Sequence, residues 1–130
     1  MRIVIDASVI IAVIANEPEK ESLIKLTQNA DLIAPYSVHW EIGNAFSSMI
    51  KKRRINGKQA SEALSIYQNI PVNFVNVDLS ESILLAEKYN IYCYDAYLLQ
   101  CGLEHRYPLI SLDAKLNQCA VEAGIKILEV

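Results

Sequence analysis

The chain has 130 residues, of which 52% are hydrophobic and 21% are charged, with only four glycines and four prolines. This length and composition predict one compact domain over residues 1–130 and exclude a disordered or low-complexity protein. The formal net charge of −3 argues against a protein that binds nucleic acid through bulk electrostatics alone.

Short aliphatic runs next to turn or cap signals predict five buried strands. The strands cover residues 2–5, 31–34, 73–77, 108–111 and 126–129. Helical patterns fill the gaps between them. The predicted helices cover residues 38–54, 58–69, 80–89, 94–105 and 114–123, and a further helix begins near residue 18.

Local signals mark where several of these helices begin. Pro18 is followed by acidic residues, which suit the positive end of a helix dipole. Ser37 is placed to be the N-cap of helix 38–54, and Asp78-x-x-Glu81 has the form of a capping box. Strands that alternate with helices predict an α/β fold, a three-layer α/β/α sandwich with a mainly parallel central sheet.

Basic residues gather where helix 38–54 ends, and an Asn56-Gly57 break then turns the chain into helix 58–69. This predicted helical hairpin holds five of the twelve basic residues: Lys51, Lys52, Arg53, Arg54 and Lys58. The five cations could contact RNA phosphates, or they could form a solvated helix end that complements the helix dipole.

Cysteine usage indicates the compartment. Cys93, Cys101 and Cys119 form no CxxC pair and are odd in number, which suits a reducing environment, so we expect a cytoplasmic protein. Residues 9–15 could pass for the core of a signal peptide, but Asp6 interrupts the approach and the run is too short to span a membrane. No membrane contact is expected.

Four acidic residues lie where predicted strands end or helices begin: Asp6, Glu41, Asp95 and Asp113. Because the carboxyl ends of parallel strands share one edge, and ligands of such sheets bind there, the four could converge in one cleft. Asp95 and Asp113 could instead only stabilise the first turns of their helices, as a first-turn acid and an N-cap. Glu41 could simply flank the apolar stripe of its helix. Asp6 is the hardest to explain by packing, because an unpaired buried carboxylate is costly.

Converging carboxylates repel one another and need a compensating positive charge. Mg²⁺ is bound by one or two carboxylates with water and phosphate oxygens, which suits an all-oxygen set of this kind. Such a site is suited to metal-assisted phosphodiester hydrolysis.

Four segments occur in an order that resembles PIN-domain ribonucleases, and most of all the VapC-type toxins of prokaryotic toxin–antitoxin pairs. They are IVIDASVII at 3–11, EIGNAF at 41–46, YDAYLL at 94–99 and LISLDAKL at 109–116. The resemblance also covers the basic hairpin and the closing EAGIKIL, and it implies a PIN-like fold for the whole chain.

Carried over residue by residue, the resemblance makes Asp6, Glu41, Asp95 and Asp113 the catalytic, metal-binding set. Ser8 and Ser111 match hydroxyl residues that would position water or the carboxylates. The family likeness further implies cleavage of RNA with Mg²⁺ or Mn²⁺, a homodimer, and inhibition by a cognate antitoxin. No acidic residue stands beside Asp113, so one metal ion is expected.

Tyr89, Tyr92, Tyr94 and Tyr97 stand close to Asp95 in the sequence. Their rings could stack on unpaired bases, or they could pack in the core or in a dimer interface.

Two other functions remain compatible with the pattern. One is a receiver-like phospho-acceptor domain with Asp78 as its acceptor, although no acid follows Asp6 directly and Leu128 stands where a receiver has lysine. The other is a catalytically silent, RNA-binding PIN-like domain, against which the presence of all four acids argues.

Overall fold

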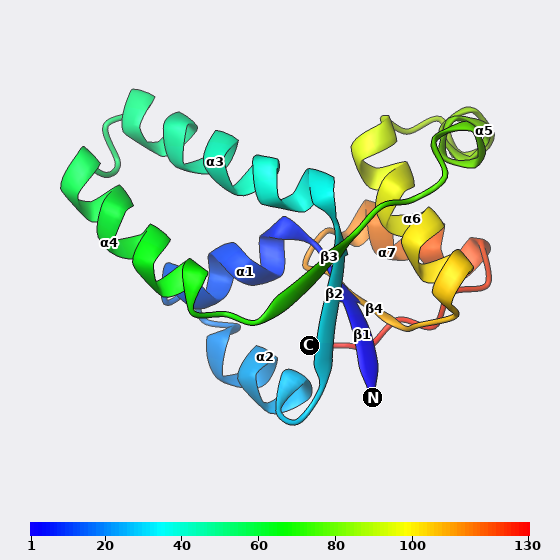
Figure 1. The fold of residues 1–130 in the computed structure, drawn as a ribbon, viewed down its shortest axis with the longest axis horizontal. Helices are drawn as coiled ribbons and strands as arrows, with labels where there is room; N and C mark the ends of the chain where they lie inside the picture. Colours follow the sequence, from blue (N-terminus) through cyan, green and yellow to red (C-terminus); the bar gives the residue numbers. More distant parts are fainter.

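A computed structural model of the chain describes residues 1–130. Four strands form one sheet in the order β3-β2-β1-β4, and seven helices surround it (Figure 1). In chain order the elements are β1 (Arg2–Ile5), α1 (Ala7–Ile14), α2 (Lys20–Thr27), β2 (Asp31–Pro35), α3 (Tyr36–Lys51), α4 (Gly57–Gln68), β3 (Val72–Val75), α5 (Leu79–Tyr89), α6 (Cys93–His105), β4 (Leu109–Ile110) and α7 (Ala114–Glu122).

All neighbouring strands are parallel. β1 lies inside the sheet, where Arg2 pairs with Asp31 of β2 and Val4 pairs with Leu109 of β4. β3 forms the outer edge beyond β2. Because every strand runs in the same direction, the carboxyl ends of all four lie along one edge of the sheet, which we call the C-terminal edge.

The helices cover the sheet in two layers. Helices α1 to α4 lie on one side of the strands and α5 to α7 lie on the other (Figure 1). On the first side α1 packs against α2, α3 and α4, and on the second α6 packs against α5, α7 and the strands β1 and β2. The predicted three-layer α/β/α sandwich with a parallel sheet is therefore confirmed.

The central strand β1 supplies the middle of the core. Ile3, Val4 and Ile5 are all buried, and α6 packs Leu98 and Leu99 against the sheet. A single cluster of 24 buried residues connects the two layers. After the exposed Arg2, β1 has only buried apolar side chains, and Asp6 follows directly.

Helix α1 is an element that the sequence analysis did not predict. Five of its eight residues are Val or Ile, and β-branched residues are poor helix formers because the helix restricts their χ1 angle. Burial of Val9, Ile10 and Ile14 outweighs this preference, because tertiary packing routinely overrides local propensity. The apolar run 9–15 is thus a core helix.

One of the predicted caps is wrong, and another has only one of its two expected hydrogen bonds. Pro35, not Ser37, is the N-cap of α3, and Ser37 lies inside the first helical turn. Asp78 does cap α5 by accepting from the backbone N–H of Glu81, 2.8 Å away. However, the N–H of Asp78 donates to Glu104 of α6 at 2.9 Å instead of to Glu81. The second hydrogen bond of the capping box is therefore missing, and this N–H connects the start of α5 to α6.

The last predicted strand is also shorter than expected. Of residues 126–129, Ile127 forms a single isolated parallel bridge with Leu109. β4 itself has only two residues, so this end of the sheet offers little backbone for a fifth strand to pair with.

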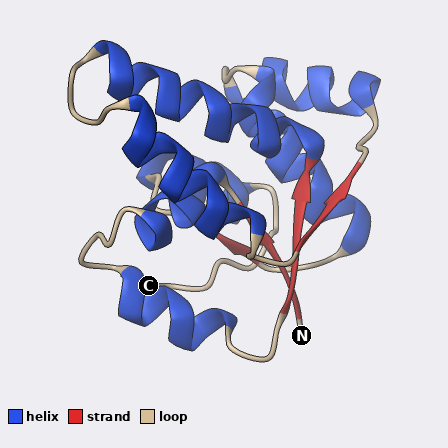
Figure 2. Cartoon of the chain, turned by 60° about the vertical axis from the view of Figure 1, so that its left-hand side comes forward, coloured by secondary structure: helices blue, strands red, loops and turns tan.

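The predicted helical hairpin is confirmed. Asn56 caps α4 and forms a reciprocal capping box with Gln59, so the break at Asn56-Gly57 is also the start of the next helix. The loop between α3 and α4 lies far from the strands (Figures 1 and 2). None of the helices has both the length and the apolar character that crossing a membrane requires.

The packing of α6 predicts unequal effects of two leucines one turn apart. Leu99 is 0% exposed, whereas Leu103 is 36% exposed. Leu99→Ala is expected to lower the free energy of unfolding by about 2–5 kcal/mol, because it removes buried methyl groups and leaves a cavity. Leu103→Ala should cost clearly less in the same urea titration, and equal losses would contradict the described core.

Candidate active site at the C-terminal edge of the sheet

Four acidic residues reach the C-terminal edge from four different elements. Asp6 directly follows β1 and is the N-cap of α1. Glu41 lies in the second turn of α3, the helix that follows β2. Asp95 lies in the first turn of α6, and Asp113 follows β4 as the N-cap of α7.

The raised pKa values of Asp6, Glu41 and Asp95 indicate that the acids of this edge are close enough to repel one another. Burial raises the pKa of Glu41 to about 7, and repulsion from Asp6 and Asp95 adds to the effect. Burial also raises the pKa of Asp95, as do Asp113 and Asp6, against the opposing effect of Lys115. The fold thus gathers acids that are 18 to 107 residues apart in the sequence into one electrostatic unit.

Asp6 is held by two serine hydroxyls. Ser8 Oγ donates to Asp6 Oδ1 at 2.6 Å, and Ser111 Oγ donates to Asp6 Oδ2. The backbone N–H of Val9 also reaches Oδ1, at 3.3 Å. Burial raises the pKa of the Asp6 carboxyl, and these hydrogen bonds oppose the rise.

Each of the two hydroxyls is in turn fixed by a backbone donor. The N–H of Leu112 donates to Ser8 Oγ at 3.1 Å, and the N–H of Asp113 donates to Ser111 Oγ at 2.9 Å. Because each Oγ accepts from a backbone N–H, its single hydrogen is directed at Asp6. This arrangement, which we call the serine clasp, ties the start of α1 to the loop that carries Asp113.

Ser8 and Ser111 were predicted to orient the carboxylates or a water molecule. In the structure both hydroxyl hydrogens are used on Asp6, so their geometry suits the first of these tasks. Oδ1 accepts from Ser8 and from the N–H of Val9, whereas Oδ2 accepts only from Ser111, so Oδ2 is the oxygen that keeps a free lone pair.

Glu41 has a buried oxygen without a partner. Its Oε1 is inaccessible to solvent and makes no hydrogen bond. Orphaned polar atoms of this kind are rare in proteins and costly. A cation among the four carboxylates would both satisfy this oxygen and relieve the repulsion between the groups.

Asp113 combines two tasks. Its Oδ1 accepts from the backbone N–H groups of Lys115 and Leu116, at 2.9 and 3.2 Å. Asp113 therefore caps α7, which was one of the two interpretations of this residue from the sequence. Both of these hydrogen bonds use the same oxygen, so the cap leaves Oδ2 free to face the other acids.

The residues at the edge fit a hard divalent cation. No three His, Cys, Asp or Glu side chains are close enough to form a ready-made metal cage. Mg²⁺ does not require one, because it usually keeps several waters and binds one or two carboxylates directly. An all-oxygen donor set with raised carboxyl pKa values and one unpartnered oxygen matches that preference.

Asn117 supports the clasp and was not identified from the sequence. Its side-chain N–H donates to the carbonyl of Ser111 at 2.9 Å, which fixes the residue whose hydroxyl holds Asp6. Asn117 lies four residues after Asp113, which places both on the same face of the helix. This spacing is the signal in the sequence that could have identified Asn117.

The basic residues of the hairpin lie away from the four acids. All five are exposed, and the end of α3 at Lys51 is ten residues beyond Glu41, or about 15 Å along the helix axis. Any RNA contact that they make therefore concerns nucleotides some distance from the carboxylates.

The four tyrosines have different surroundings. Tyr89 packs against the core, and Tyr94 and Tyr97 form an edge-to-face pair at 6.1 Å. Tyr92, at 87% exposure, has a free ring.

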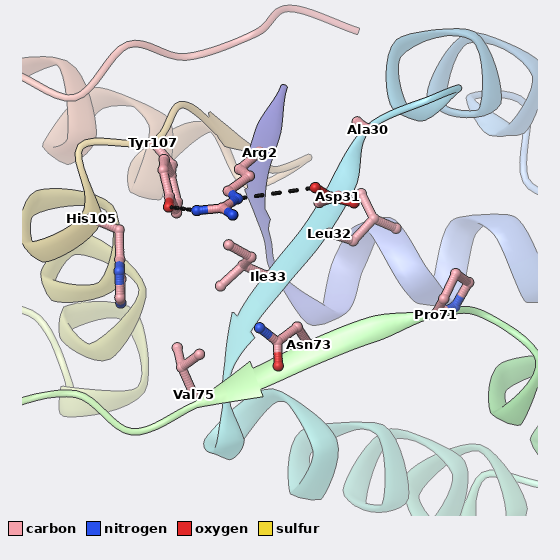
Figure 3. Close-up of a pocket in the computed structure, with 10 residues that line it drawn as sticks. All are labelled: Arg2, Ala30, Asp31, Leu32, Ile33, Pro71, Asn73, Val75, His105 and Tyr107. Atoms are coloured by element: carbon pink, nitrogen blue, oxygen red, sulfur yellow. Dashed lines mark hydrogen bonds and ion pairs between the residues drawn. The ribbon is translucent and has the colours of Figure 1, made fainter.

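The largest cavity lies away from these acids. It has a volume of about 420 Å³, and Figure 3 shows Arg2 between Tyr107 and Asp31 at its wall. Arg2 donates to the Tyr107 hydroxyl at 2.7 Å and approaches Asp31 to 4.0 Å. Arg2 and Asp31 begin their strands, so this cavity opens toward the amino-terminal edge, where parallel sheets do not usually bind substrates.

Comparison with protein families agrees with this geometry. The family model of the PIN domain matches residues 3–122. The chain belongs to the PIN domain family. The match spans β1 to the end of α7, and it contains all four acids and both serines of the clasp.

Solved structures of other proteins show the same fold. PAE2754 from Pyrobaculum aerophilum superposes with a TM-score of 0.75 at 20% identity, over 98% of this chain and 83% of that one. VapBC2 from Rickettsia felis, bound to a DNA fragment of its promoter, gives 0.68 at 12% identity over 98% of both chains. VapC20 from Mycobacterium tuberculosis, a toxin that cleaves the sarcin–ricin loop, gives 0.63 at 14% identity over 89% of this chain and 93% of that one.

A search of curated protein sequences gives no match. Membership of the PIN domain family sets aside the receiver alternative. In the structure Asp78 is exposed and occupied as a cap, since its Oδ1 accepts from Ser80 and from the N–H of Glu81.

The raised pKa of Glu41 predicts how the metal-free protein responds to pH. Between the ordinary value of 4.5 and the folded value of about 7, the folded state binds more protons than the unfolded state, so stability falls as pH rises through this window. In urea titrations with EDTA, wild type should be less stable at pH 7.5 than at pH 5. Glu41→Gln should lose less stability over the same range, and an equal loss would contradict the coupling described.

Proposed function

We propose that the protein is a Mg²⁺- or Mn²⁺-dependent endoribonuclease and the toxin of a toxin–antitoxin pair. The observation that carries the proposal is the set of four mutually repelling carboxylates at the C-terminal edge, with Asp6 fixed by the serine clasp and Glu41 Oε1 unpartnered. Asp6, Glu41, Asp95 and Asp113 would hold the cation.

The bound cation would activate a water and stabilise charge on the phosphodiester. The side chains of this chain have separate tasks around it. The serine clasp keeps Asp6 in one orientation and leaves Oδ2 with capacity to bind the cation. Glu41, whose buried Oε1 has no partner in the metal-free structure, would serve as a ligand, because the positive charge of the cation favours its carboxylate form.

RNA is the proposed substrate because a protein with the same fold cleaves RNA. VapC20, which cleaves the sarcin–ricin loop, shares the fold over most of this chain. The exposed hairpin cations Lys51, Lys52, Arg53, Arg54 and Lys58 would contact phosphates beyond the cleavage site. Their phosphate contacts would add affinity without sequence preference.

An antitoxin partner is proposed on the same basis. The structures with this fold include a toxin–antitoxin complex from Klebsiella pneumoniae, at a TM-score of 0.63 and 15% identity over 97% of this chain and 95% of that one. We also propose a homodimer, which the exposed apolar residues Leu79, Ile83 and Leu84 of α5 favour. Co-expression with the product of an adjacent small reading frame, followed by a mass measurement of the complex, tests both assemblies.

The three free cysteines of the chain suit the proposed cytoplasmic location.

The carboxylates predict complete dependence of RNA cleavage on two of them. With Mg²⁺ or Mn²⁺, wild type should cut RNA, and Asp6→Asn and Asp95→Asn should each abolish cutting, because each removes a charged ligand from the site. Neither variant should unfold the metal-free protein, since each relieves repulsion among the acids. Gel analysis of cleaved RNA and circular dichroism measure the two outcomes.

Asp31→Asn is the matched control. It removes one carboxylate from the exposed start of β2, at the opposite edge of the sheet, so cleavage should continue. RNA that is bound but never cut by wild type would favour the catalytically silent alternative, and cleavage that survives Asp6→Asn would contradict the assigned site.

A further inference from the structure

A second cavity adjoins the acid site on its α6–α7 side. It has a volume of about 370 Å³ and is lined by Asn90, Ile91, Tyr92, Asp95 and Lys115. Asp95 belongs to the four acids, so the cavity opens directly beside them. It contains one cation and one exposed aromatic ring.

Lys115 is a cation without a protein partner. Arg2 and Asp31 form the one ion pair within 4.0 Å in the structure, so no carboxylate neutralises the Lys115 ammonium at close range. It nevertheless lies near enough to the acid site to lower the pKa of the Asp95 carboxyl, although burial and the other acids raise that pKa more strongly. An unpaired ammonium at the rim of an acidic cleft is free to bind an anion.

The start of α7 does not supply this anion site by itself. Asp113 already accepts from the backbone N–H groups of Lys115 and Leu116. The capped helix end therefore has fewer free donors, and the side chain of Lys115 is the group that can hold a phosphate.

Tyr92 is presented on a short, fixed loop. Asn90 adopts the left-handed conformation at φ 52° and ends α5, with its N–H bonded to the carbonyls of Ala86 and Glu87. The N–H of Ile91 also returns to the carbonyl of Ala86, at 3.0 Å. Tyr92 then begins α6 as its N-cap, with its ring 87% exposed.

We propose that this cavity is a subsite for a nucleotide next to the cleaved bond, in which Lys115 binds the phosphate and Tyr92 stacks on the base. The inference deepens the proposed function and rests on it. Four carboxylates repel a polyanion even with a divalent cation among them, so a substrate needs a positive contact at the entrance. Base stacking on an aromatic face adds affinity that does not depend on sequence.

The test measures RNA binding apart from cleavage. The probe is a short, fluorescein-labelled, single-stranded oligoribonucleotide of mixed sequence, with Mg²⁺ present and the Asp6→Asn protein as parent so that the RNA stays intact. Fluorescence anisotropy at several salt concentrations gives both the affinity and its salt dependence.

Lys115→Met should weaken binding and reduce the slope of log K against log salt by about 0.7, which is the loss of one phosphate contact to a single strand. Lys115→Arg should restore the slope. Lys126→Met is the charge-matched control, because Lys126 lies beside the start of β4 at the opposite edge of the sheet, and it should bind RNA like the parent.

Tyr92→Ala should weaken binding at least about fivefold with an unchanged salt slope, whereas Tyr92→Phe should bind like the parent, because stacking needs the ring and not the hydroxyl. Both positions are exposed, and circular dichroism verifies that each variant is folded. In proteins that retain Asp6, Lys115→Met should raise the KM of cleavage more than it lowers kcat.

The outcomes separate this inference from the proposed function. Cleavage that requires Asp6, together with an affinity and salt slope unaffected by Lys115→Met, would overturn the subsite and leave the nuclease standing. An RNA that wild type never cuts, but that loses affinity and slope in Lys115→Met, would overturn the nuclease and support the subsite. Equal losses in Lys115→Met and Lys126→Met would show a diffuse charge effect and overturn the subsite.

Discussion

The rest of the site depends on how one buried carboxylate is held. Asp6 follows β1, which lies inside the sheet, and is itself only 6% exposed, a position where an unpaired charge is costly. Two serines from opposite ends of the chain donate to its two oxygens, and backbone N–H groups of consecutive residues fix those serines. The same four hydrogen bonds that stabilise Asp6 also place the loop of Asp113 beside it.

Repulsion among the four acids gives the site its chemistry. Carboxyls with pKa values raised by burial and by one another favour whatever brings positive charge to them. A divalent cation provides that charge at the centre of the set, and Lys115 provides it at the rim. The same edge of the sheet thus combines the groups that would bind a metal with a group that would bind a substrate phosphate.

Much of this arrangement could be predicted from the sequence because it follows from strand order. The apolar runs identified the strands, and parallel topology required Asp6, Glu41 and Asp113 to share an edge. Helix α1 was missed because its Val and Ile residues have low helix propensity and only tertiary burial favours it. Asp78 caps α5 as predicted, but the reciprocal bond of the capping box is missing because Glu104 of α6 accepts from the N–H of Asp78. Ser37 was wrong because α3 begins two residues earlier, after Pro35. Asn117 was missed although its hydrogen bond is local. Lys115 could not be identified from the sequence, because only the fold brings it to one cavity with Tyr92 and Asp95.

The most direct measurement is diffraction from crystals grown with Mn²⁺, collected at a wavelength where manganese scatters anomalously. We expect an anomalous peak at coordination distance from an Asp6 oxygen, bordered by Asp95, Asp113 or Glu41, and no such peak in crystals of Asp6→Asn. Crystals whose bound manganese lies elsewhere, with the four carboxylates directed into separate regions of solvent, would contradict it.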